Sequence, residues 1–231
     1  MNNVDEIIAA AKKKGQTNLS EFESKQLLTE YGIPVVREVL VQDLVSAKNA
    51  ASEIGYPVVI KACSSEVTHK TEKGLIKVDL RTETELTEAF QTLQRLSEGV
   101  ETEFLIQQMI KGPRELVIGM KRDQQFGPCV MFGLGGIFTE ILHDVSFRVA
   151  PIDKGDALSM MRDIRGHKIL EGIRGLDPVD LEILSRSLVG LGRLGLEHAE
   201  IQEIDVNPLI VQGSKPIGVD ALVVLGDTQA L

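Results

Sequence analysis

The sharpest local signal in the sequence is at residues 201–225, which read IQEIDVNPLIVQGSKPIGVDALVVL. Its alternating apolar residues predict two strands, 201–212 and 216–225, joined by a tight turn. A type II′ turn prefers glycine first, which places a two-residue turn at Gly213-Ser214. Pairing is then symmetric about this turn, and Asn207 lies directly opposite Asp220.

This opposed pair has the chemistry of a cation site. Opposed residues of an antiparallel pair share a face, with Cβ atoms about 5 Å apart. A carboxylate and an amide oxygen at that separation suit Mg²⁺, which takes one or two protein oxygens and completes its shell with phosphate and water. Strand alternation puts Glu203 and Asp205 on the same face. The alternative interpretation is a solvated polar pair on an exposed hairpin.

The rest of the chain divides into two parts with different patterns. Residues 1–111 alternate helix and strand signals. After a short leading helix we expect three helices, at 21–31, at 44–54 and after Thr82. Strands are expected at 35–41, 58–62, 75–80 and 104–110. From residue 112 onward, strands at 115–121, 128–132 and 146–152 come without helices between them, which favours antiparallel pairing.

A helical block at 154–198 follows, and its best helix is expected to start at Asp177-Pro178. These patterns together predict an α+β fold of two lobes, residues 1–111 and 112–231, with a ligand site in the cleft between them.

The composition excludes several classes of protein. The 231 residues include 25 Lys and Arg against 34 Asp and Glu, for a net charge of -9, with 4% aromatic residues and no Trp. A nucleic-acid partner is therefore not expected. No run of about 18 apolar residues is present, and the acidic N-terminus differs from a signal peptide, so we expect a cytoplasmic protein without a membrane partner. Cys63 and Cys129 are interpreted as inert buried thiols.

The hairpin resembles the metal-binding end of the ATP-grasp fold in acyl-CoA synthetase subunits. Three further segments match the same family in order: PVVIK at 57–61, THKTEKG at 68–74, and GLGGIF at 133–138, the last followed by Asp144 and by FRVAP at 147–151. The chain is thus similar to the β subunit of the ADP-forming acetyl-CoA synthetases from about residue 18 onward. It departs from many relatives at Thr71 to Gly74, where they carry Ser-Asp and a small pair.

The resemblance implies roles for individual residues. Lys61 would contact nucleotide phosphates, Glu115 would lie near the sugar, and Arg148 would pair with phosphate. The segment expected to meet adenine through its backbone consists of Gln107, Gln108, Met109 and Ile110. Asn207 and Asp220 would hold Mg²⁺ with ATP or ADP. The glycine cluster at 133–136 does not open a helix, so we interpret it as a permissive turn lining the site.

His69 is the residue on which the implied chemistry depends. It lies in a polar segment with Ser64, Ser65 and Gly74 near its ends, and a neutral imidazole is a competent phosphoryl acceptor. The resemblance implies that acyl-CoA, ADP and phosphate give acid, CoA and ATP reversibly, with His69 passing the phosphoryl group to ADP. A CoA-binding α subunit with a second catalytic histidine would complete an α2β2 enzyme.

Two other functions stay open from the sequence. One is another ATP-grasp ligase, such as a succinyl-CoA synthetase β subunit or a carboxylate–amine ligase. The other is a non-catalytic nucleotide-sensing module of a larger acyltransferase. His69 favours the acetyl-CoA synthetase β subunit over the other ligases. The presence of Lys61, Asn207 and Asp220 favours that β subunit over a sensing module.

Overall fold

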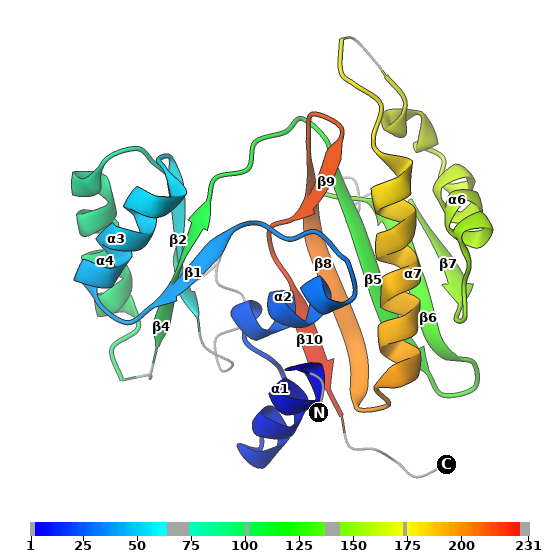
Figure 1. Ribbon diagram of the computed structural model, residues 1–231, viewed down its shortest axis with the longest axis horizontal. Coiled ribbons are helices and arrows are strands. Elements are labelled where there is room, and N and C mark those ends of the chain that lie inside the picture. Colours follow the sequence, from blue (N-terminus) through cyan, green and yellow to red (C-terminus); the bar gives the residue numbers. More distant parts are fainter. Residues whose placement is uncertain (1–2, 64–73, 100–101, 137–143, 173–174, 227–231) are drawn as a thin grey trace. The chain divides into compact units, whose positions relative to one another are not determined.

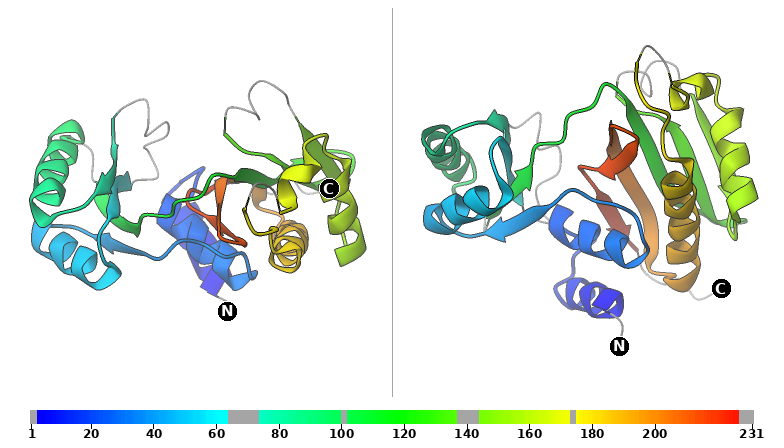
Figure 2. Two further views of the ribbon diagram at one scale, coloured as in Figure 1. Left: turned by 90° about the horizontal axis from the view of Figure 1, so that it is seen from above. Right: turned by 45° about the horizontal axis from the view of Figure 1, so that its top comes forward.

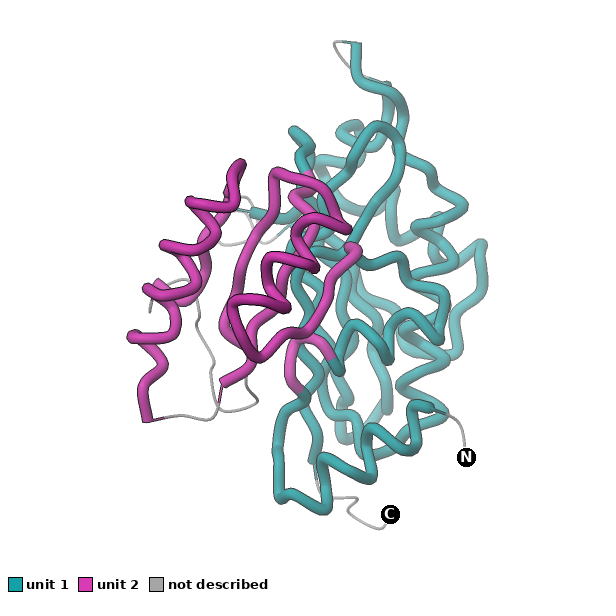
Figure 3. The backbone as a smooth tube through the Cα atoms, turned by 60° about the vertical axis from the view of Figure 1, so that its left-hand side comes forward, with its two compact units in different colours: residues 1–19, 23–35, 111–231 teal, residues 20–22, 36–110 magenta. Residues whose placement is uncertain are grey.

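The computed structural model describes residues 3–63, 74–99, 102–136, 144–172 and 175–226. Two compact units are present, which Figure 3 shows in separate colours: residues 20–22 with 36–110, and residues 1–19, 23–35 and 111–231. The break between residues 110 and 111 lies one residue from the predicted boundary. The N-terminal residues, however, belong mostly to the larger unit, and not to the first lobe where we expected them.

Two N-terminal helices explain this difference. α1 (Asn3–Lys13) and α2 (Glu21–Glu30) each direct an apolar side into the core of the larger unit. Val4 and Ile8 of α1 and Leu27 and Leu28 of α2 are buried in the same cluster as the strands of the C-terminal half. Local sequence signals place such helices along the chain, but they do not say which sheet will bury them.

The smaller unit is a four-stranded antiparallel sheet with two helices on one face (Figure 1). The strand order is β1-β4-β2-β3, with β1 (Glu38–Val41), β2 (Val58–Cys63), β3 (Ile76–Leu80) and β4 (Glu103–Gln108). The helices are α3 (Leu44–Ile54) and α4 (Glu83–Leu96). Each begins at a polar cap, because the side chains of Asp43 and Thr82 accept hydrogen bonds from the backbone N–H groups of Ser46 and Glu85. The bounds of α3 are those predicted.

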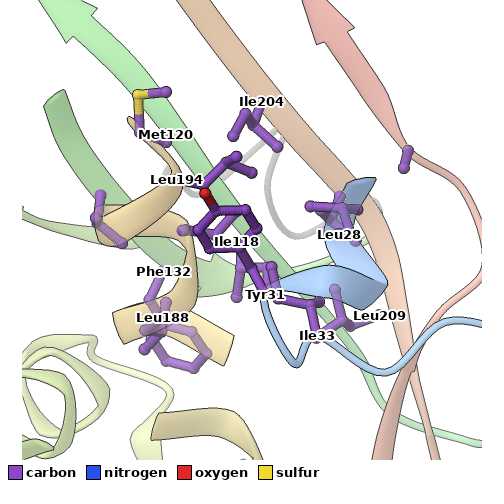
Figure 4. Packing of buried hydrophobic residues seen from close by; sticks show 14 of the residues in the cluster. Leu28, Tyr31, Ile33, Ile118, Met120, Phe132, Leu188, Leu194, Ile204 and Leu209 are labelled. Carbon is purple, nitrogen blue, oxygen red and sulfur yellow. The ribbon is translucent and has the colours of Figure 1, made fainter. Parts of the chain in front are cut away.

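The larger unit is built on one antiparallel sheet with strand order β10-β8-β5-β6-β7 and with β9 paired to β8. Its strands are β5 (Glu115–Asp123), β6 (Gly127–Leu134), β7 (Val145–Val149), β8 (Ile201–Gln212), β9 (Lys215–Gly218) and β10 (Leu222–Leu225). α6 (Lys154–Asp163) and α7 (Leu181–Glu197) pack on one face of β5, β6 and β7, as the views in Figure 2 also show. The core lies there, where Leu188 and Leu194 of α7 meet Ile118, Phe132 and Tyr31 (Figure 4).

The long helix α7 starts later than the sequence predicted. Asp180, and not Asp177, is its N-cap, and the Asp180 carboxylate accepts hydrogen bonds from the N–H groups of Glu182 and Ile183 at 3.0 Å. The segment before Asp180 is held by a different contact, because Val179 N–H donates to the carbonyl of Leu170. Leu170 is the last residue of a short 3-10 helix, η1 (His167–Leu170). Tertiary contacts therefore override the Asp-Pro start signal. Among the described residues, no helix is long and apolar enough to cross a membrane.

Candidate functional site

The register of the last hairpin on both sides of Asn207 and Asp220 agrees with their predicted opposition. On one side of this pair, β8 and β9 join Leu209 to Gly218 and Gln212 to Lys215. On the other side, β8 and β10 join Asp205 to Leu222. From Glu203 to Gln212, β8 pairs symmetrically about Gly213-Ser214, and Gly213 has the positive φ of 62° that a glycine-first turn requires.

A bulge in β8 lies at this same point. β5 pairs Leu116 with Leu209 but Ile118 with Val206, so β8 holds one extra residue around Asn207 and Pro208. Bulges of this kind redirect side chains next to functional sites. Asn207 is exposed there.

Buried Arg114 fastens the tip of the hairpin to the segment before α7. Its guanidinium donates to the carbonyl of Gly213 at 3.0 Å and to that of Asp177 at 2.6 Å, and further to those of Ile169 and Glu171. Asp180 N–H adds a bond to the carbonyl of Ser214 at 2.8 Å. The C-terminal end of β8, the strand that carries Asn207, is thereby held in place.

The carboxylates beside Asn207 create a strongly negative site. Burial, followed by the charges of Glu203 and Asp220, raises the pKa of Asp205 to about 6. Lys121 offsets little of this charge, because its Nζ is 3.9 Å from the Glu203 carboxylate and its side chain is 76% exposed. A bound cation would relieve the repulsion among these groups.

The donor set fits a hard cation that keeps most of its shell for other ligands. Within the ranges that the structure describes, no group of three or more His, Cys, Asp or Glu residues is arranged to hold a metal ion. Asp220 and Asn207 instead offer the one or two oxygens that Mg²⁺ takes when substrate phosphates and water supply the rest. The Asp220 carboxylate also accepts a hydrogen bond from Ala221 N–H at 2.8 Å, which orients it.

We expect the raised pKa of Asp205 to make stability depend on pH. The folded state holds a proton on this carboxyl that the unfolded state has already released, so stability falls as pH rises from about 4 to about 6. Asp205→Asn removes that penalty and should raise the free energy of unfolding by about 2 kcal/mol near pH 7.5, with little gain near pH 4. Urea denaturation without divalent cations, at both pH values, measures this.

Glu171→Gln is the control, because that side chain is an exposed carboxylate of the same unit. It should leave stability nearly unchanged at both pH values. An equal effect of Asp205→Asn at the two pH values would show that Asp205 does not titrate as its surroundings indicate.

The glycine cluster lets the chain pass closely over Glu115, in agreement with the predicted permissive turn. Gly135 N–H donates to the Glu115 carbonyl at 2.8 Å, and a Cβ at Gly135 would lie 2.9 Å from that residue's carbonyl carbon. Gly136 has a φ of 64°, and a Cβ there would lie 2.8 Å from the Glu115 carboxylate. Glu115 itself is exposed at the start of β5.

Arg148 does not lie where the resemblance led us to expect it. Along the sheet register, Asp205 pairs with Gly119, Gly119 with Met131, and Met131 with Phe147, so strand alternation places Arg148 on the opposite face from Asp205. There its guanidinium forms an ion pair with Asp163 and donates to the Ser159 hydroxyl, both on α6. Arg148 therefore links β7 to α6. It does not lie on the face of the sheet that carries Asp205.

In the smaller unit, Lys61 is a buried residue of β2 and not a lysine that reaches solvent. It is 5% exposed, and its Nζ lies 2.6 Å from the Glu21 carboxylate. Glu21 is the residue that sequence reasoning missed. As the first residue of a helix it looks like an ordinary dipole-favoured carboxylate, and no sequence signal connects it to a lysine 40 positions away.

The predicted adenine segment lies at the end of β4, which stops at Gln108. Gln108 N–H donates to the carbonyl of Arg37 at 2.9 Å, and Met109 N–H to that of Pro57 at 3.3 Å. Any backbone contact of these two residues with a base must therefore use their carbonyl groups. Gln107 and Ile110 are buried. His69 lies outside the described residues.

Comparison with known proteins decides the family. A model of the ATP-grasp domain matches residues 10–225. The β subunit of the ADP-forming acetate–CoA ligase I of Pyrococcus furiosus is 44% identical over 225 residues, which cover 95% of this chain and 97% of that subunit. The chain belongs to the ATP-grasp family, among the ADP-forming acetate–CoA ligase β subunits.

Other members of this family extend the comparison. The 4-hydroxybutyrate–CoA ligase of Nitrosopumilus maritimus is 38% identical over 89% of this chain, which spans only 30% of that longer protein. An acetyl-coenzyme A synthetase 1 of Ca. Korarchaeum cryptofilum superposes with a TM-score of 0.86 at 41% identity, over 96% of this chain and 100% of that one. That structure holds coenzyme A and Mg-AMPPCP, with its phosphohistidine segment pointing towards the nucleotide-binding site.

Proposed function

We propose that the chain is the nucleotide-binding β subunit of an ADP-forming acyl-CoA synthetase. It makes ATP from acyl-CoA, ADP and phosphate, reversibly, by way of a phosphohistidine. The observation that carries the proposal is the near end-to-end match to a β subunit of that activity, at 44% identity. The opposed Asn207 and Asp220 support it, because they fit the metal of a Mg-nucleotide.

Each side chain has a defined task in this proposal. Lys61 offsets negative charge on the nucleotide phosphates, and Glu115 lies by the sugar. The base is met by backbone groups of Gln107, Gln108, Met109 and Ile110. Asn207 and Asp220 hold Mg²⁺, which would supply charge neutralisation at the phosphates during in-line transfer.

His69 is the phosphoryl acceptor. Its imidazole nitrogen takes the phosphoryl group from the partner subunit and gives it to the terminal phosphate oxygen of ADP, so that one N–P bond breaks as one P–O bond forms. Lys70 and Lys73, close in sequence, can screen the added charge of about -2.

The partner is a CoA-binding α subunit that carries a second catalytic histidine, in an α2β2 assembly. The coverage pattern supports the existence of such a partner, since the chain matches a separate subunit in one relative but 30% of a single longer chain in another. We also propose a cytoplasmic location, which is supported by Cys63 and Cys129 both being reduced thiols that form no disulfide.

Reconstitution tests the proposed division of labour. The purified chain should bind Mg-ADP, as measured by calorimetry, but give no ATP from acetyl-CoA, ADP and phosphate. Adding a CoA-binding α subunit should start ATP formation. Robust turnover by the isolated, homogeneous chain would contradict the proposal, because the acyl and CoA chemistry would then lie within these 231 residues.

A further inference from the structure

The ion pair between Lys61 and Glu21 is buried. The side chains are 6% and 1% exposed, and the Nζ and Oε1 atoms are 2.6 Å apart. Both residues belong to the same compact unit, although 40 positions separate them. The neighbours of Lys61 across the sheet are Leu105 and Ile76, so the surroundings in the sheet are apolar.

The pair lies on the face of the sheet opposite to α3 and α4. Val58, Ile60 and Ala62 of β2 pack into the cluster beneath those helices, so strand alternation turns Lys61 to the other face. Gln107 of β4 lies on that same face, since Phe104 and Ile106 join the helix-side cluster. One face therefore combines Lys61 with the strand that leads to the proposed adenine contacts.

Stability alone gives little reason to keep such a pair. Taking two charges out of water costs about as much as their attraction returns, and apolar replacements of similar volume are often neutral or stabilising. The burial of Lys61 together with Glu21 therefore indicates that the positive charge of Lys61 has a function at this position. An ammonium has three donors, so a hydrogen bond to Glu21 does not prevent it from meeting a phosphate oxygen.

We propose that Glu21 is a positioning residue, whose carboxylate holds the Lys61 ammonium where it meets the phosphates of the bound nucleotide. This inference rests on the proposed function, in which Lys61 contacts those phosphates. Without Glu21, the flexible four-carbon stem of Lys61 leaves its charge without a fixed place. Glu21 acts only through Lys61, so its effect on nucleotide binding disappears when Lys61 is absent.

A double-mutant cycle on the full chain tests the inference. The variants are Lys61→Met, Glu21→Gln and the two combined, and calorimetry measures their affinities for Mg-ADP and for adenosine, which has no phosphates. Lys61→Met should weaken Mg-ADP binding by about 10-fold to 100-fold, and Glu21→Gln by about tenfold. In the Lys61→Met background, Glu21→Gln should change Mg-ADP affinity by less than about twofold. Adenosine affinity should stay the same in every variant.

Glu83→Gln is the matched control, because Glu83 pairs with Lys48 at 2.8 Å in the same unit but is 64% exposed. It should leave Mg-ADP affinity unchanged. If Glu21→Gln does not fold, Glu21→Asp keeps the buried charge but shortens its reach, and should show the same dependence on Lys61.

The outcomes separate the inference from the proposed function. Unchanged Mg-ADP affinity in Lys61→Met would mean that the proposed phosphate contact is wrong. Three results would overturn the positioning role of Glu21 if Lys61→Met weakens Mg-ADP binding as expected. The Glu21 variant could leave Mg-ADP affinity unchanged, or lower it equally with and without Lys61. It could also lower the affinity for adenosine as much as that for Mg-ADP.

Discussion

Replacing His69 by alanine abolishes ATP formation in the complete enzyme and leaves Mg-ADP binding unchanged. The proposed phosphoryl carrier has then lost the imidazole that accepts the group, and no other step of the proposed reaction delivers phosphate to ADP. Removal of a group that forms the covalent intermediate should lower turnover by at least about a thousandfold. A luciferase-coupled assay of ATP formation from acetyl-CoA, with the α subunit present, measures the loss.

His167→Ala is the matched histidine control. The His167 ring lies in η1, with its Nδ1 3.2 Å from the carbonyl of Ile164, and has no part in the proposed transfer. This variant should keep near-normal turnover. If His69→Ala did so as well, the phosphohistidine relay would be wrong for this protein.

Asp220→Asn should weaken Mg²⁺-dependent ADP binding by about 100-fold, because it removes the anionic metal ligand and keeps the size of the side chain. The fold should persist, since an amide oxygen can still accept the hydrogen bond that Ala221 N–H donates to the Asp220 side chain. Calorimetric titration with ADP at several Mg²⁺ concentrations separates the metal effect from binding of the nucleotide alone.

Glu182→Gln serves as a control for lost negative charge in the same unit, because this exposed carboxylate pairs with Lys154 on the helical side. It should leave the Mg²⁺ dependence as it is. A wild-type Mg²⁺ dependence in Asp220→Asn would reject the assignment of Asp220 as a metal ligand.

The parts of the site that could be predicted from sequence are those fixed by local rules. The two-residue turn at Gly213-Ser214 sets the register of the hairpin, so Asn207 and Asp220 could be opposed without knowledge of the rest of the sheet. The bounds of α3 follow in the same way from the Asp43 cap and from Gly55, which has a φ of 90°.

The parts that could not be predicted depend on tertiary contacts. The facing of Arg148 follows from the register across β5, β6 and β7, which no single turn determines. Arg114 bonds four carbonyls that come from two distant segments. The contact of Glu21 with Lys61 likewise joins two residues of one unit that lie 40 positions apart, so it arises only in the folded chain.

Transfer of phosphate to the chain itself is the direct test of the phosphohistidine relay. The wild-type chain is incubated with Mg²⁺ and ATP labelled in its terminal phosphate, quenched on the millisecond scale, and assayed for label that is acid-labile and base-stable. We expect such label at His69 in the wild type and none in His69→Ala, as a phosphohistidine relay requires. A wild-type chain that never carries this label, even transiently, would contradict it.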